Sequence, residues 1–249
     1  MNRTILANEV FSRYEFKYLL SAALSSRVQE EVSHFMQIDH HARIADDNQY
    51  LVRSLYFDNA NTTNFYEKID GVRTRRKFRL RTYVNTEEAD TPVFLEVKGR
   101  HNERTYKERV ALDWRDISWC TDVARHADLQ SRYQDTPLIE AFVFDATRRR
   151  LRPRLLVDYL RRPYTSHYDT NFRVTFDAAI KTAPATGLFP NAPNQFRACV
   201  AGWTVLEIKF DRRIPAWFHR ILQVNNMRRL SISKFVVGMK TCKLANDLS

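Results

Sequence analysis

The residues RRKFRLRTY, 75–83, combine a strand pattern with a high density of positive charge. Five of the first seven side chains are Lys or Arg, yet charged and apolar residues still alternate as they do in a strand with one buried face. One side of the extended chain carries Lys77, Arg79, Arg81 and Tyr83. Arginine forms forked, charge-assisted hydrogen bonds with phosphate oxygens, so this stretch predicts a site for phosphate groups.

Similar alternation recurs along the chain and predicts eight strands. They cover 12–20, 50–58, 75–84, 92–100, 103–112, 153–162, 171–178 and 203–210. Helices are predicted over 21–36, 114–125, 137–150, 215–223 and 234–245, whereas 181–202 reads as a long surface loop rich in Pro and Ala.

One side of these strands carries most of their charge. It holds thirteen cations, Arg13, Lys17, Arg53, Lys77, Arg79, Arg81, Lys98, Arg100, Lys107, Arg109, Arg161, Arg173 and Lys209, and four carboxylates, Glu15, Glu96, Asp177 and Glu207. An ordinary sheet with a solvated polar face is one interpretation. Across eight strands the excess of long cations favours an α+β fold in which an eight-stranded antiparallel β-barrel has a charged interior and helices packed outside.

Length and composition limit the classes of function. The 249 residues predict one domain over 12–249 behind a flexible segment 1–11. A net charge of +11 favours a polyanionic partner, which could be nucleic acid, an acidic membrane surface or a phosphate-rich small molecule. The five glycines form neither a GxxxxGK[ST] loop nor a GxGxxG turn, so side chains must bind any phosphate.

Other features narrow the partner and the compartment. The aromatic residues fall mainly on the apolar faces, so no specific nucleic acid is expected, although a nucleic-acid or anionic-surface module stays as an alternative. Three widely spaced cysteines without a CxxC pair suit a reducing cytoplasm. No stretch has the length of an apolar membrane span, so any membrane association is expected to run through a partner protein.

Several segments together resemble a known family. In chain order these are RYEFKYLL, VRSLYFDN, KFRLRTY, FLEVKGR, LLVDYLRRPY, FRVTFD, TVLEIKF and SISKF. They resemble the VTC domain, the polyphosphate polymerase module of the vacuolar transporter chaperone complex and a member of the CYTH-like triphosphate tunnel metalloenzymes. The resemblance implies a tunnel-shaped barrel that transfers the ATP γ-phosphoryl group to a polyphosphate chain with Mn²⁺ or Mg²⁺. Hydrolysis of triphosphate or polyphosphate, or binding alone, remains open.

The resemblance also implies roles for individual residues. The positions expected to act on the triphosphate are Arg79, Arg81, Lys98, Arg161, Arg173 and Lys234. The wider substrate-binding set adds Lys17, Arg53, Lys77, Arg100, Lys107, Arg109, Tyr159, Lys209 and Ser233, of which Ser233 is also predicted to cap the helix that follows it.

Carboxylates are the expected metal ligands. Glu207 matches the metal-binding glutamate of the family, with Glu96 or Glu15 as further ligands, because Mg²⁺ and Mn²⁺ prefer hard oxygen donors. A salt bridge within the sheet is the alternative role for Glu207. Arg13 stands where the family signature ExExK has its first glutamate.

Overall fold

One long antiparallel sheet dominates the protein, whose computed structural model describes residues 14–246 except 89, 103, 167, 170 and 191–194. The strands are β1 (Tyr14–Ser21), β2 (Met36–Ile38), β3 (Tyr50–Asp58), β4 (Thr74–Thr82), β5 (Val93–His101), β6 (Arg104–Leu112), β7 (Arg152–Ser166), β8 (Arg173–Pro184), β9 (Arg197–Ala198) and β10 (Trp203–Phe210). The predicted flexible segment 1–11 and Arg13 lie outside the described residues.

Helices connect and cover these strands. The α-helices are α1 (Ala22–Ser33), α2 (His40–Arg43), α3 (Thr63–Ile69), α4 (Ile117–Thr121), α5 (His126–Arg132), α6 (Pro137–Arg148), α7 (Ala216–Val224) and α8 (Lys234–Thr241). Short 3₁₀ turns cover Asp46–Asn48, Trp114–Asp116 and Val123–Arg125. Among the described residues, no helix combines the length and apolar character needed to cross a membrane.

The strand order corrects the predicted barrel. Eight strands follow the order β1-β10-β8-β7-β3-β4-β5-β6, while β2 pairs with β7 and β9 pairs with β8. The antiparallel α+β architecture is confirmed, but the sheet has ten strands, and within the described residues no backbone pairing joins β1 to β6. The two additional strands are short pieces that fall where the sequence predicted the end of a helix and a loop.

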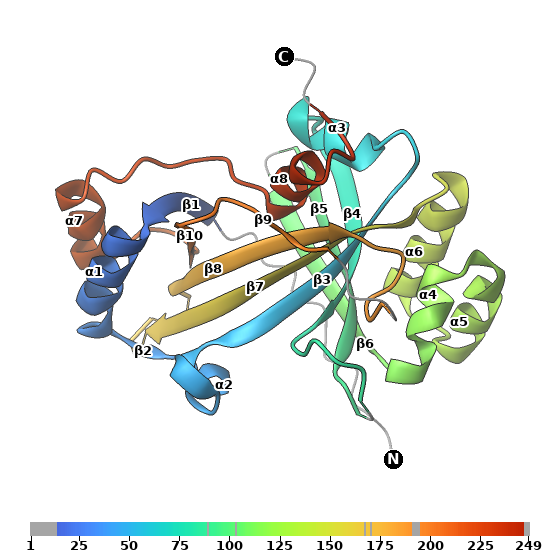
Figure 1. The fold of residues 1–249 in the computed structure, drawn as a ribbon, viewed down its shortest axis with the longest axis horizontal. Coiled ribbons are helices and arrows are strands. Elements are labelled where there is room, and N and C mark those ends of the chain that lie inside the picture. Colours follow the sequence, from blue (N-terminus) through green and yellow to red (C-terminus); the bar gives the residue numbers. More distant parts are fainter. Residues whose placement is uncertain are drawn as a thin grey trace.

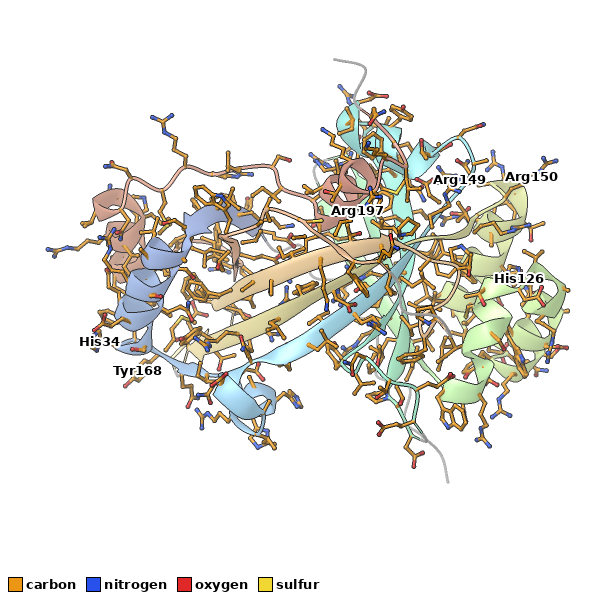
Figure 2. The ribbon with its side chains drawn as sticks, viewed as in Figure 1. His34, His126, Arg149, Arg150, Tyr168 and Arg197 are labelled. Atoms are coloured by element: carbon orange, nitrogen blue, oxygen red, sulfur yellow. The ribbon has the colours of Figure 1, made fainter. Side chains whose placement is uncertain are left out.

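Two groups of helices cover the apolar side of the sheet (Figure 1). At one end, α4, α5 and α6 bury residues such as Phe78 and Leu95, and His126 lies among these helices with its ring 5.7 Å from that of Phe142 (Figure 2). At the other end, α1 and α7 bury Phe176 and Ile208. Burial of these faces excludes water from the sheet on this side and provides most of the hydrophobic stabilisation.

Helix α8 differs, because it packs on the opposite side of the sheet. Its Phe235 and Met239 join a buried cluster with Tyr56 and Leu155, on the side of β3 and β7 that also carries charge. At Gly238 a Cβ atom would lie 2.8 Å from Leu155 Cδ2, so only glycine lets the helix approach this closely. The prediction that the helices pack outside is therefore wrong for α8.

Candidate functional site

The strand register places the charged side chains on one side of the sheet, here called the charged face. On one part of the sheet, Tyr56, Arg79, Glu96 and Arg109 follow one another as cross-strand partners. On the other part, Lys17 pairs with Glu207, and Lys209 pairs with both Glu15 and Arg173. The cations of the charged face on the strands are Lys17, Arg75, Lys77, Arg79, Arg81, Lys98, Arg100, Lys107, Arg109, Arg161, Arg173 and Lys209.

Glu96 gathers three of these cations. Arg79 Nη2 and Lys107 Nζ each lie 2.7 Å from a Glu96 oxygen, and Arg81 Nη1 lies 3.6 Å away. Burial would raise the pKa of Glu96, which is 1% exposed, but the three cations hold that pKa well below its ordinary range. Arg79 also donates to Tyr56 Oη at 2.9 Å. The carboxylate thus stays ionised and fixes the arginine fork in place.

A second group surrounds Lys17. Its ammonium lies 2.9 Å from Glu15 and 3.8 Å from Glu207, and Lys209 lies 3.0 Å from the other oxygen of Glu207. Burial and the repulsion between the two glutamates raise the pKa of Glu15, yet Lys17 and Lys98 outweigh both effects and lower it. The pKa of Glu207 is likewise well below its ordinary value, despite burial, because of Lys209 and Lys17. Both glutamates are therefore ionised neighbours.

The same group includes an ion pair between β1 and β5, two strands that are far apart in the strand order. Lys98 Nζ of β5 donates to both oxygens of Glu15 of β1, at 3.1 and 2.9 Å. Because β1 begins the strand order and β5 is the last strand but one, the sheet must curl round for these side chains to meet. The charged face is therefore the concave inner face of the curl.

Asp177 organises a third group near α8. Arg161 makes a forked pair with its two oxygens at 2.7 and 2.8 Å, and Lys234 lies 2.6 Å from one of them. Both cations also lie over the ring of Tyr159, 5.3 and 4.6 Å from its centroid. Ser233 caps α8, since its Oγ accepts a hydrogen bond from the Val236 amide at 3.5 Å. The structure thus brings Tyr159, Arg161, Ser233 and Lys234 together at the start of α8.

Lys77 has no carboxylate partner of this kind. Within the described residues, no Asp or Glu forms a salt bridge with its ammonium, which lies 5.0 Å over the ring of Phe235. Burial and the neighbouring charges of Lys98 and Lys17 lower the pKa of Lys77 to about 7. The folded protein therefore disfavours the charge of Lys77, and a bound anion beside it would restore that charge.

A family relationship accounts for this arrangement. The family described as the VTC domain matches residues 12–243 of the chain. The chain belongs to the VTC domain family. No curated protein matches it in sequence.

Two solved structures share the fold of this VTC domain. A protein from Bacillus halodurans named as an adenylate cyclase is 11% identical with a TM-score of 0.53, over 90% of this chain and 96% of that one. A protein from Hippeastrum named as an adenylyl cyclase, with a dominant triphosphatase activity, is 12% identical with a TM-score of 0.52, over 92% and 97%. At these identities the likeness shows a common fold.

One predicted binding residue of the VTC domain lies elsewhere. Arg53 is on the opposite side of β3 from Ser54 and Tyr56, where it makes a forked pair with Asp158 at 3.0 and 2.7 Å. It also donates to the Asn85 carbonyl oxygen at 2.9 Å. The prediction that Arg53 lies on the same side of the strands as the other cations is therefore wrong, because its side chain faces the buried Asp158 carboxylate away from the charged face.

The three predicted metal ligands of the VTC domain, Glu15, Glu96 and Glu207, do not lie in one group. Within the described part of the chain, no group of three His, Cys, Asp or Glu side chains could hold an ion. Glu15 and Glu207 are neighbours, but Glu96 is enclosed by Arg79, Arg81 and Lys107, so the three do not form one cage. Two carboxylates still suit Mg²⁺ or Mn²⁺, which take part of their ligands from substrate phosphates.

The remaining predicted cations lie at the edges of the charged face of the VTC domain. Arg173 lies 3.3 Å from Asp39, Arg100 donates to the Asn102 carbonyl oxygen at 2.6 Å, and the Arg109 guanidinium lies 5.0 Å over the Phe94 ring. Sequence reasoning missed the organising role of Asp177 and the contact of Tyr56 with Arg79. A carboxylate aligned with cations on alternating positions of a strand was the available signal for Asp177.

Proposed function

We propose that this VTC domain binds triphosphate and polyphosphate on its charged face and transfers phosphoryl groups with a divalent metal. In the favoured reaction, ATP and a polyphosphate chain of n units give ADP and a chain of n + 1 units. The observation that carries the proposal is the row of cations formed by Lys77, Lys98 and Lys107, which are direct cross-strand partners. Like charges placed opposite one another destabilise a sheet. Lys98 pairs with Glu15 and Lys107 with Glu96, but no carboxylate of the described residues pairs with Lys77, so an anion bound there would be stabilising.

The chemistry needs little covalent help from the protein. Phosphoryl transfer depends chiefly on positioning and on neutralising the charge of the transferring group. Arg79 is already held in a fixed orientation by Glu96 and Tyr56, so its remaining donors would meet phosphate oxygens without a large loss of side-chain entropy. Arg161, fixed by Asp177, would act in the same way from the facing part of the sheet.

The carboxylates Glu15 and Glu207 are the residues that fit a divalent metal. Both are ionised, they are close enough to repel one another, and oxygen is the donor that Mg²⁺ and Mn²⁺ prefer. When bound, the metal would neutralise charge on the phosphates. The Lys17 ammonium between the two carboxylates holds them in place when the site is empty.

Hydrolysis is the second candidate. The Hippeastrum protein with the same fold is described by its dominant triphosphatase activity, which supports chemistry on triphosphates in general. Polymer synthesis and hydrolysis use the same binding residues and differ in whether a phosphate chain or water attacks the γ-phosphorus. The charge of the face alone does not separate them.

Incubation of the purified protein with ATP and Mn²⁺, followed by separation of the products by length, tests the proposal. Polymer accompanied by ADP supports the transferase reaction, whereas orthophosphate with ADP supports the hydrolase. A parallel titration with tripolyphosphate, read as a rise in melting temperature, tests binding itself. No product together with no stabilisation by tripolyphosphate would overturn the proposed function.

A further inference from the structure

The charged face changes character at one end. Along β4 and just beyond it, the side chains on this face are Arg75, Lys77, Arg79, Arg81 and finally Tyr83. Two rings from neighbouring strands join Tyr83 there: Tyr50 of β3, with ring centroids 5.6 Å apart, and Phe94 of β5, with centroids 6.2 Å apart. These three residues, here called the aromatic end, follow directly upon the row of cations.

Two rings of the aromatic end are cross-strand partners of cations on the charged face. Tyr50 is the cross-strand partner of Arg161, and Phe94 is the cross-strand partner of Arg81. Cross-strand partners lie roughly 5 Å apart, which is within reach of both the base and the phosphates of one nucleotide. The two aromatic side chains therefore lie directly beside Arg161 and Arg81, cations of the charged face at this end.

The geometry of the rings suits stacking. Tyr83 meets Tyr50 at an interplanar angle of 82° and Phe94 at 65°, so these rings touch edge to face and not face to face. All three side chains are only partly buried. Partly exposed aromatic side chains beside arginines are the kind of platform on which nucleic-acid bases stack, whatever their sequence.

At the opposite end of the charged face, the paired positions of β4 and β5 both carry cations. Arg75 is the cross-strand partner of Arg100, and Lys77 is the partner of Lys98. Lys68 of α3 lies among the same cations, since burial and the charges of Arg75 and Arg100 lower its pKa. This end suits the most highly charged part of a ligand, whereas an uncharged base suits the aromatic end.

We propose that Tyr50, Tyr83 and Phe94 bind the base of a nucleoside triphosphate by stacking, with the triphosphate running from them along β4 towards Lys77. The inference rests on the proposed function and adds the orientation of the nucleotide. The terminal phosphoryl group is then the one closest to Lys77, whose ammonium forms no salt bridge with an Asp or Glu of the described residues.

The test compares ligands that share a triphosphate and differ in the base. Dissociation constants for ATP and for tripolyphosphate are measured by calorimetry without metal, at one ionic strength, for the wild type, Tyr83→Leu and Tyr83→Phe. Tyr83→Leu keeps apolar volume but removes the ring, so it should weaken ATP binding about tenfold and leave tripolyphosphate binding within twofold. Tyr83→Phe keeps the ring and should bind both ligands as the wild type does.

A matched control separates stacking from general packing. Tyr14 is also a partly exposed tyrosine, stacked on Phe210 with centroids 5.4 Å apart, but it lies on the opposite side of β1 from Glu15. Tyr14→Leu should change neither constant. Equal weakening of ATP and tripolyphosphate by Tyr83→Leu, or no change in ATP binding, overturns the inference while the proposed function stands. Failure of the wild type to bind tripolyphosphate removes the proposed function as well.

Discussion

Lys77 of β4 and Lys98 of β5 are direct cross-strand partners on the charged face, and Lys98 is one of the charges that lower the pKa of Lys77 to about 7. Burial is the larger cause of this shift. The folded protein therefore keeps a lysine where its charge is unfavourable. Such a position costs stability in the empty protein and favours the binding of an anion.

Replacing this lysine should stabilise the empty protein. We expect Lys77→Met to raise the melting temperature by about 2–8 °C near pH 6.5, which corresponds to roughly 1–2 kcal/mol for a chain of this size. The same substitution should weaken tripolyphosphate binding. Lys243→Met, at an exposed position just after α8, is the control and should alter neither quantity.

The effect of Lys77→Met should depend on pH with a defined sign. Between pH 7 and 10.5, Lys77 is protonated in the unfolded chain but largely neutral in the folded protein, so the wild type gains stability as the pH rises. The advantage of the variant should therefore shrink between pH 6.5 and pH 9.5 in thermal unfolding without ligand. An advantage that is the same at both values would contradict the low pKa of Lys77.

Arg79 and Arg53 provide a matched pair of substitutions on opposite sides of the sheet. Arg79→Gln should weaken tripolyphosphate binding at least tenfold, because it removes a charged fork from the face that we propose binds phosphate. Arg53→Gln should leave that constant within twofold but lower the melting temperature by roughly 10 °C, because it leaves the buried Asp158 carboxylate unpaired. Equal losses of binding in the two variants would show that phosphate is not confined to the charged face.

Glu96→Gln tests whether this carboxylate organises cations or holds metal. Without its charge, Arg79, Arg81 and Lys107 repel one another, so the empty variant should melt at a lower temperature. Tripolyphosphate should then raise the melting temperature by more than it does in the wild type, since the ligand replaces the missing negative charge. Loss of Mn²⁺-dependent turnover, with unchanged stability, would instead make Glu96 a metal ligand.

Glu207→Gln addresses the metal directly. The substitution keeps the size of the side chain and removes the charge that a divalent ion needs, so most metal-dependent turnover should be lost. Tripolyphosphate binding without metal should persist or tighten, because one repulsive carboxylate is gone. If Glu207 only pairs with Lys209 and Lys17, the variant should lose stability and keep its turnover with Mn²⁺.

The side on which each residue lies was largely predictable, because it follows from the two-residue period of a strand. Arg79, Glu96 and Glu207 lie on the side that the alternation indicated. Arg53 shows the limit of this reasoning. In VRSLYFD the side chains on the charged face are Val52, Ser54 and Tyr56. Because Arg53 is the only cation in this mostly apolar strand, the alternation does not indicate which side of the strand belongs to the charged face.

Tertiary packing explains the other differences. The predicted loop 181–202 contains the end of β8 and all of β9, because Cys199 donates a backbone hydrogen bond to Ile180 and Lys181 pairs with Ala198. The predicted helix over 114–125 is divided into α4 and two 3₁₀ turns, and Asp122 with extended dihedral angles ends α4. The position of α8 depends on the contact of Gly238 with Leu155, for which local sequence carries no signal.

The contact between Lys98 and Glu15 has a consequence for the shape of the curled sheet. A ladder of backbone hydrogen bonds fixes the register of two strands, whereas an ion pair between flexible side chains allows them to slide and separate. Bound phosphate would compete with Glu15 for Lys98, and a bound metal would compete with Lys98 for Glu15. Both ligands would therefore weaken the ion pair that joins β1 to β5. The diameter of the curled sheet can therefore vary. Added salt screens the ion pair and should increase this diameter in the protein without ligand.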